Sequence, residues 1–297
     1  MNITEMIYWD HYYNMIQLIN LSIVIVLFIL LRLFLGAIVH INTSHELFKK
    51  DNPAFGISLA AATLAVTIML SGTVYGDGDS TIFDSALSVG LFGLFGILLM
   101  ALTRMIFEKI TLSSILIRDE IVKGNIAVAI ADAGNVLAAA IIIRAIMIWV
   151  TAASIEGITI LLGGYALSQI VLTVMTVIAI KFFGRLNKDA DFYNELNTNN
   201  IALAVRFAGE KIGAAFAIAT AAQIVVYDEY NIINILAAWF IVLIGIVIIW
   251  RVLSWLTCQI ILYKADINDE VVRQKNVAVG ALQAVIYISI GLLILQL

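Results

Sequence analysis

Two apolar stretches of this sequence contain polar side chains that could bind or pass ions. One stretch holds Asp132 and Asn135, and the other holds Arg206, Glu210 and Lys211. A charge inside the hydrocarbon of a membrane is energetically costly, and such residues mark ion pathways, proton relays or buried ion pairs. Asp132 and Glu210 are therefore candidates for a pair of carboxylates that handles protons or cations.

The spacing of these residues leaves two interpretations open. Arg206 and Glu210 are four residues apart and Asp132 and Asn135 are three apart, so each pair can share one face of a helix. In the first interpretation, Asp132 neutralises Arg206 or Lys211, and this ion network only fixes the packing of the helices. In the second, the two carboxylates line a polar path. The neutral ligands of that path would be Asn135, Thr63, Gln283 and Tyr287.

The elements that position these side chains are predicted to be membrane-spanning helices. The chain has 297 residues, of which 62% are hydrophobic and 13% are charged. Soluble domains contain about 25% charged residues, so this composition excludes a water-soluble globule. The single proline fits long uninterrupted helices, and the apolar runs lack the alternating polarity of a transmembrane barrel. Eight runs are long enough to cross a membrane, and they begin near Ile16, Pro53, Ser85, Ile126, Ile158, Ile201, Ile232 and Val277.

Lys and Arg lie on one predicted side of the membrane. Apart from Arg144, Arg206 and Lys211 inside even-numbered runs, they occur at the ends of the odd-numbered runs and in the loops that follow. The other loops carry acidic residues and neither Lys nor Arg. By the positive-inside rule, the loops after odd-numbered runs are cytoplasmic and both termini lie outside. One basic residue marks the end of each odd-numbered run and is expected to anchor it by snorkelling. These border anchors are Arg32, Arg104, Lys181 and Arg251.

The four even-numbered runs open with the same frame, Asn-x-Ala-x-(Ala/Gly). Its copies lie about 75 residues apart and begin at Asn52, Asn125, Asn200 and Asn276. We expect each asparagine to be a helix N-cap, because its side chain can accept a hydrogen bond from a backbone N–H two or three residues later. An acidic residue precedes each asparagine by five or six positions, and these acids are Glu46, Glu120, Glu195 and Glu270.

This repetition defines the predicted fold. Each repeat crosses the membrane twice, so successive repeats keep the same orientation, which favours quasi-symmetry about an axis along the membrane normal. We therefore predict an all-α membrane protein whose eight helices form four parallel two-helix repeats around a partly polar interior. The cytoplasmic segments 33–48, 105–123 and 252–264 mix apolar and charged residues as interfacial helices do.

Residues 119–130, Asp-Glu-Ile-Val-Lys-Gly-Asn-Ile-Ala-Val-Ala-Ile, followed by Gly134, resemble the bacterial YjfL-like inner-membrane family, which is catalogued as a domain of unknown function. The segment Asn52-Pro53-Ala54 resembles it too. A typical member of that family resembles one four-helix unit. The resemblance implies two tandem units, at residues 18–150 and 157–297, after a periplasmic segment at 1–17. It also implies the bacterial cytoplasmic membrane, and no settled activity.

We expect a channel or transporter-like protein for protons, cations or small solutes that uses the intramembrane carboxylates. The alternative is a membrane-stress or scaffold protein that transports nothing and docks soluble proteins through its cytoplasmic segments. Only three histidines and one cysteine occur, and His45-Glu46 lacks the second histidine of a zinc-protease helix, so we expect no enzyme activity, cofactor or metal. The expected partners are the lipid bilayer and no nucleic acid, while a soluble cytoplasmic protein and a homo-oligomer stay open.

Overall fold

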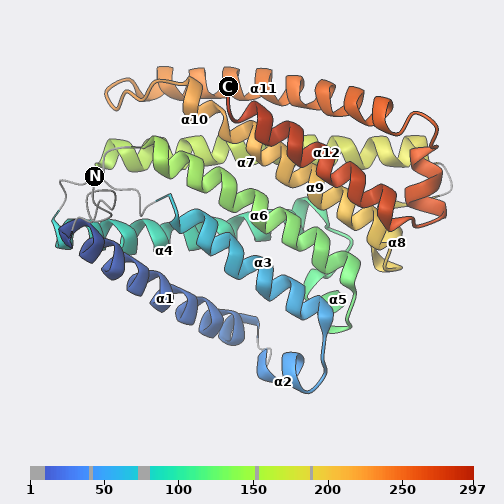
Figure 1. Ribbon diagram of the computed structural model, residues 1–297, viewed down its shortest axis with the longest axis horizontal. Helices are drawn as coiled ribbons and strands as arrows, with labels where there is room; N and C mark the ends of the chain where they lie inside the picture. Colours follow the sequence, from blue (N-terminus) through green and yellow to red (C-terminus); the bar gives the residue numbers. More distant parts are fainter. Residues whose placement is uncertain (1–10, 40–42, 73–80, 151–153, 188–189) are drawn as a thin grey trace, which may run out of the picture.

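The computed structural model describes residues 11–39, 43–72, 81–150, 154–187 and 190–297, and every regular element among them is helical (Figure 1). A long helix lies at each of the eight predicted positions. The long helices are α1 (His11–Val39), α3 (Pro53–Leu70), α4 (Ile82–Ile106), α6 (Ile126–Trp149), α7 (Ile155–Leu186), α9 (Ile201–Ala219), α11 (Ile232–Ile261) and α12 (Val277–Ile294). The short elements are α2 (Thr43–Phe48), η2 (Phe107–Thr111), α5 (Ile117–Val122), α8 (Phe192–Asn197), α10 (Ala221–Ile224) and η3 (Asp269–Arg273), of which η2 and η3 are π-helical.

Seven of the long helices are long and apolar enough to cross a membrane. The exception is α9, because Arg206, Glu210 and Lys211 lie within its 19 residues. This helix packs between α6 and α12, and its residues Glu210 and Lys211 are buried. The protein is therefore a multi-pass membrane protein in which the most polar long helix is shielded by its neighbours.

The eight long helices form two rows (Figure 1). In one row, α3 packs on α6, α6 on α9 and α9 on α12. The other row contains α1, α4, α7 and α11. A buried polar contact joins each neighbouring pair of this second row: Asn20 donates to Ser85, Thr103 bonds Tyr165, and Trp239 donates to Ser168. Each two-helix repeat thus adds one helix to each row.

Small residues let the helices of the first row approach closely. A Cβ atom on Gly134 of α6 would lie 2.5 Å from the Cα atom of Ala208 in α9, and one on Gly209 would lie 2.3 Å from the Cα atom of Ala284 in α12. Without a hydrophobic force between helices in lipid, such close backbone packing is a main source of association. The small residues that follow each asparagine therefore set the spacing of this row.

The rows differ from the predicted arrangement around an interior. The four repeats succeed one another by lateral packing, and α3 and α12 lie at opposite ends of the first row (Figure 1). The prediction that the four repeats surround a partly polar interior was therefore wrong for the single chain. Parallel repeats are related by one rotation and translation that recurs between neighbours. Four copies form a row when that rotation is too small to close a circle.

Two of the segments predicted to be cytoplasmic also differ from the prediction of interfacial helices. Residues 105–123 leave α4 through η2 and fold back as α5, and they bury Phe107, Leu112, Ile115, Ile117 and Ile121 in one apolar cluster. Residues 252–261 are simply the last turns of α11. The apolar side chains of the first segment pack in a cluster shared with other repeats, whereas the second segment extends α11. At the other end of the chain, residues 11–17 of the predicted N-terminal segment are helical and belong to α1.

Candidate functional site

A layer of polar side chains crosses both rows at one depth. On α3, α6, α9 and α12 it lies six to eleven residues after each N-cap asparagine, which is about 9–16 Å along the helix axis. We call this set the polar layer. It consists of Ser58, Arg104, Asp132, Asn135, Arg206, Glu210, Lys211, Arg251 and Gln283.

Asp132 is paired with a basic residue from the other row. Its carboxylate oxygen Oδ2 lies 3.0 Å from Nη2 of Arg104 on α4, and it accepts a hydrogen bond of 3.3 Å from the hydroxyl of Ser58 on α3. The carboxylate is buried, whereas about a third of the Arg104 side chain is exposed. The pair therefore ties three helices together, and the partners of Asp132 are Arg104 and Ser58, where Arg206 or Lys211 had been predicted.

Glu210 has an equivalent partner. Its oxygen Oε1 lies 2.5 Å from Nη1 of Arg251 on α11, which again joins the two rows. Arg104 and Arg251 had been predicted to be snorkelling anchors at the membrane border. They turn toward buried carboxylates because a charge-assisted hydrogen bond is stronger in a low-dielectric interior than at a hydrated surface. Lys181 is exposed on α7, and the side chain of Arg32 lies outside the described residues.

Lys211 is buried without a carboxylate partner among the described residues. Its ammonium nitrogen donates to Oδ1 of Asn135 at 3.2 Å. It also lies 5.0 Å from the ring centre of Phe107 and 5.8 Å from that of Phe207, where the negative faces of the rings stabilise a cation. Sequence reasoning missed both rings. The three-residue spacing of Arg104 and Phe107 was the available signal, because it puts both on one side of a helix.

Several atoms of the polar layer have no hydrogen-bond partner in the described structure. They are the second carboxylate oxygen of Asp132, the amide nitrogen of Asn135, Nη1 of Arg206 and the amide oxygen of Gln283, and each is buried. A buried polar atom without a partner costs about 1–3 kcal/mol. These four atoms would therefore be stabilised by water or by a bound polar solute.

One of the predicted neutral ligands does not join this set. Thr63 is exposed on α3, and its hydroxyl donates to the carbonyl of Leu59 in the same helix. Tyr287 is buried on α12 beside the layer, where its side chain interacts with Arg206, Glu210 and Arg251. Asn135 and Gln283 do lie in the polar layer. The layer thus contains two ion pairs, Asp132–Arg104 and Glu210–Arg251, and two basic residues without a carboxylate partner among the described residues. Two amides and the hydroxyl of Ser58 complete it.

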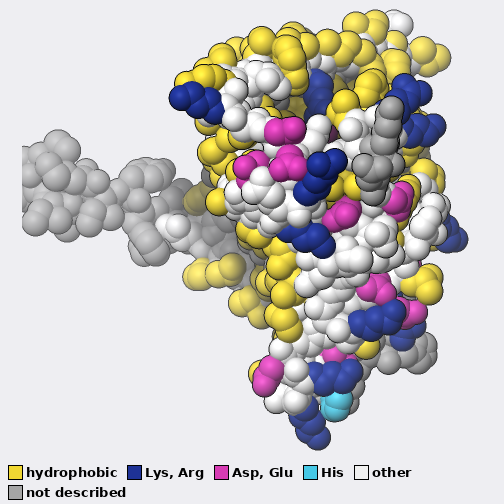
Figure 2. Space-filling model, turned by 90° about the vertical axis from the view of Figure 1, so that its right-hand side faces the viewer, with side chains coloured by type: hydrophobic (Ala, Val, Ile, Leu, Met, Phe, Trp, Pro, Cys, Tyr) yellow, Lys and Arg dark blue, Asp and Glu magenta, His cyan; other side chains and the backbone are white. Residues whose placement is uncertain are grey.

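A second polar arrangement recurs four times at the end of the molecule that carries α2, α5 and α8. Lys and Arg side chains lie among Asp and Glu over this end (Figure 2). Each asparagine of the repeat is the N-cap of its helix, and its side-chain oxygen accepts from the backbone three residues later. Its amide nitrogen donates to the glutamate of its own repeat at 2.8–3.1 Å. The repeated acid is therefore the acceptor that orients the N-cap.

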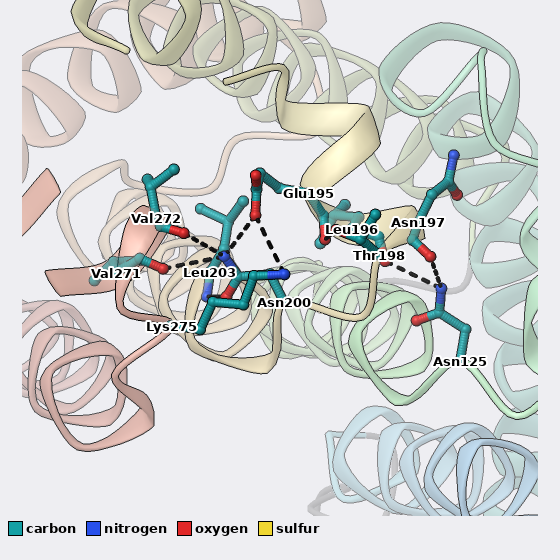
Figure 3. A network of polar contacts seen from close by, with 10 residues as sticks. All are labelled: Asn125, Glu195, Leu196, Asn197, Thr198, Asn200, Leu203, Val271, Val272 and Lys275. Atoms are coloured by element: carbon teal, nitrogen blue, oxygen red, sulfur yellow. Dashed lines mark hydrogen bonds and ion pairs between the residues drawn. The ribbon is translucent and has the colours of Figure 1, made fainter. Parts of the chain in front are cut away.

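The same amide nitrogen joins neighbouring repeats. Asn52 donates to the carbonyl of Ile121 at 2.9 Å. Asn125 donates to that of Leu196 at 3.0 Å, and Asn200 to that of Val271 at 3.1 Å (Figure 3). In each case the carbonyl belongs to the residue after the glutamate of the next repeat. We call this set of bonds the asparagine junction.

The backbone before each asparagine takes a conformation that the sequence did not reveal. The residue preceding it has a positive φ angle in all four repeats: 48° at Asp51, 91° at Gly124, 59° at Asn199 and 52° at Lys275. This left-handed residue ends the short helical element before the asparagine and lets the N–H of the asparagine donate to the carbonyl of the same glutamate. One short turn thus holds both the backbone and the side chain of the N-cap.

Neighbouring lysines keep Glu46 and Glu120 ionised, so both can accept hydrogen bonds from the asparagines. A hydrogen bond from Lys50 lowers the pKa of Glu46, and the amide of Asn52 adds to this effect against the opposing effect of burial. In the next repeat, a hydrogen bond from Lys123 lowers the pKa of Glu120 in the same way. Both carboxylates therefore remain ionised at neutral pH, which strengthens the hydrogen bonds from the asparagines.

Replacing Asn125 by serine tests the asparagine junction. Serine is as good an N-cap as asparagine, but it cannot donate to both Glu120 and Leu196. Because two hydrogen bonds are lost, one of them to a charged group, the free energy of unfolding should fall by about 2 kcal/mol. Unfolding in mixed detergent micelles measures this change. Asn276→Ser is the matched control and should cost less, because Asn276 bonds only Glu270 among the described side chains and carbonyls. Equal losses at the two positions would contradict a junction between repeats.

Comparison with known proteins agrees with the internal repetition. The family model described as Domain of Unknown Function (DUF350) matches residues 10–147 and again residues 153–296. No curated protein and no solved structure matches the chain. Each matched range contains two asparagine frames and four of the long helices. The chain therefore belongs to the DUF350 family and contains two tandem copies of its domain.

Proposed function

We propose that this protein is a transporter or channel of the bacterial cytoplasmic membrane, and that its polar layer passes a small anionic solute. The observation that carries the proposal is the charge balance of the layer. Arg104, Arg206, Lys211 and Arg251 are basic, whereas only Asp132 and Glu210 are acidic. Both acids are paired with arginines, so the charges without a carboxylate partner in the described structure are Arg206 and Lys211.

This balance favours an anion over the protons or cations expected from the two carboxylates. A carboxylate whose charge is already neutralised by an arginine attracts a further cation less strongly than a free carboxylate does, so it is a poor cation ligand. The buried ammonium of Lys211 and the buried Nη1 of Arg206, by contrast, are stabilised by a counter-charge in a medium of low dielectric constant. A transient anion would supply that charge and would also satisfy Nη1 of Arg206.

The proposed topology places the layer within the membrane. We propose that α9 is an eighth span, since it lies between two spanning helices and its charges are directed into the bundle. The concentration of Lys and Arg at the end of the asparagine junctions supports a cytoplasmic position for that end, with both termini outside. On this topology an anion would leave the positively charged cytoplasmic surface and meet Arg206 and Lys211 on its path.

Docking of soluble proteins by the cytoplasmic segments is less well supported. Phe48, Ile110 and Leu116 are exposed on the predicted cytoplasmic segments, so docking remains a second candidate. Other apolar side chains at this end are buried: Ile117 and Ile121 in α5, Phe192 and Leu196 in α8, and Val271 in η3. These side chains pack the repeats together and are not free to bind a partner.

Flux into proteoliposomes tests the proposal. We expect the wild-type protein to pass chloride into vesicles that contain a chloride-quenched dye, and to pass neither potassium nor protons at a comparable rate. Lys211→Met should lower the chloride flux at least tenfold, because it removes the buried charge and keeps the length of the side chain. Lys181→Met is the matched control, since it removes the same charge from an exposed site, and its flux should equal that of the wild type.

Other outcomes would overturn the proposal. Potassium or proton flux without chloride flux would contradict anion transport and favour a cation pathway at the carboxylates. A chloride flux that Lys211→Met leaves unchanged would show that the anion does not pass through the polar layer. The amount of folded protein in each vesicle preparation is measured by size-exclusion chromatography before reconstitution. Replacing a buried charge by an apolar side chain of similar size is often neutral for stability, so Lys211→Met should fold.

A further inference from the structure

The asparagine junction is incomplete in the last repeat. An asparagine amide has two donor hydrogens, and in the first three repeats one bonds the repeat's own glutamate and the other bonds the next repeat. Asn276 belongs to the last of the four described repeats, and its amide nitrogen bonds only Glu270 among the described residues. The row therefore ends on a donor whose acceptor is known from three equivalent positions.

The first repeat holds the matching acceptors. Counted from the glutamate, the carbonyls of Ile121, Leu196 and Val271 correspond to that of Leu47 in α2. The preceding repeat buries the side chains of Ile121, Leu196 and Val271, which are 0–3% exposed. In the first of the described repeats, Leu47 is only partly buried, and the adjacent Phe48 is 74% exposed.

The helix faces next to these groups are likewise buried between repeats but open at the two ends of the row. The alanine two residues after the asparagine is fully buried in the first three repeats, as Ala54, Ala127 and Ala202, but the equivalent Ala278 is exposed. In the interface between the last two repeats, a Cβ atom on Gly280 would lie 2.4 Å from the carbonyl oxygen of Ala202. Gly56 is the equivalent of Gly280 in the first repeat, and a Cβ atom there would meet only Leu47, at 4.0 Å.

We propose that the row continues into a second copy of the chain. Ala278 and Asn276 of one copy would pack on Gly56 and Leu47 of the next, and Asn276 would donate to the carbonyl of Leu47. The contact repeats an interface that the chain already forms three times, so its shape and its hydrogen bonds are both specified. It joins two different surfaces, and such a head-to-tail contact produces a ring when its rotation closes and an open filament when it does not. The contact does not depend on which solute the polar layer passes.

Cross-linking of two differently tagged chains tests this contact. Both chains carry Cys258→Ala, which removes the single cysteine; one also carries Ala278→Cys and the other Gly56→Cys. We expect a short bismaleimide, added to membranes that contain both chains, to link the two tags. Membranes that contain only one of the variants should give no cross-linked dimer. A chain that carries both cysteines should give a ladder of higher oligomers or one closed species.

Control substitutions keep the result interpretable. Leu186→Cys, at the exposed end of α7, replaces Gly56→Cys in a control pair and should give no cross-link with Ala278→Cys. Asn276→Ser keeps the N-cap and removes the amide donor, so it should lower the yield of the mixed dimer several-fold. A dimer of Ala278→Cys with itself would show a symmetric contact and overturn the proposal, as would the absence of any mixed dimer in membranes where both chains are present and folded. An unchanged yield with Asn276→Ser would overturn the role given to its amide.

Discussion

Replacing Asp132 by asparagine is expected to lower the free energy of unfolding by about 3 kcal/mol. The substitution removes the carboxylate charge 3.0 Å from the guanidinium of Arg104 and leaves that cation without a counter-charge between the two rows. Removing one partner of a buried ion pair costs about 3–5 kcal/mol, and the partial exposure of Arg104 places this pair at the lower end of the range. Unfolding in mixed detergent micelles measures the loss.

Two further variants identify the cause of this effect. Asp119→Asn removes the same charge from an exposed site on α5 and should change stability by less than about 0.5 kcal/mol. The double variant Arg104→Leu, Asp132→Leu should recover most of the lost stability, because apolar side chains often replace a buried ion pair without cost. A double variant that is less stable than either single variant would show that the pair is not the source of the loss.

Introducing valine at Gly209 is expected to be the most damaging change at a helix crossing. A Cβ atom there would lie 2.3 Å from both the Cα and the Cβ atoms of Ala284, and a backbone atom cannot move away without separating α9 from α12. Overpacking costs about 1–3 kcal/mol when side chains can adjust, and this contact offers no such adjustment, so a loss of about 3 kcal/mol or more is expected. The yield of folded protein and its unfolding in detergent measure the effect.

The matched control is Gly245→Val in α11. An added Cβ atom there meets nothing within 4 Å, so the substitution should be neutral or slightly stabilising, since glycine is a poor helix former. Similar losses at Gly209 and Gly245 would show that the helix itself is sensitive to valine and would contradict the close crossing of α9 and α12.

The sequence predicted the first residue of five long helices, and the other three begin slightly earlier than predicted. Pro53, Ile126, Ile201, Ile232 and Val277 are the first residues of five helices, as expected. These boundaries could be predicted because an N-cap, a proline and the length of an apolar run act locally, within a few residues of the helix end. The tandem family matches also follow from a pattern that is present in the sequence itself.

The candidate site was only partly predictable. Intramembrane charges stand out in an apolar sequence, so Asp132, Glu210 and Lys211 could be selected by type and depth alone. Their partners could not be selected, because Arg104 and Arg251 come from helices whose neighbours depend on how the repeats are arranged. A border arginine and a paired arginine look the same in sequence, and only the facing carboxylate distinguishes them.

By itself, the sequence determined the helices, their parallel repetition, the N-cap asparagines and the concentration of basic residues at one end. Only the tertiary structure decided that the repeats form a row, that each asparagine bonds the following repeat, and that Ala278 and Phe48 remain exposed at the two ends. The reason is physical. A helix start is set by interactions over a few residues, whereas the partner of a repeat is set by backbone approach between helices about 75 residues apart, which no local pattern specifies.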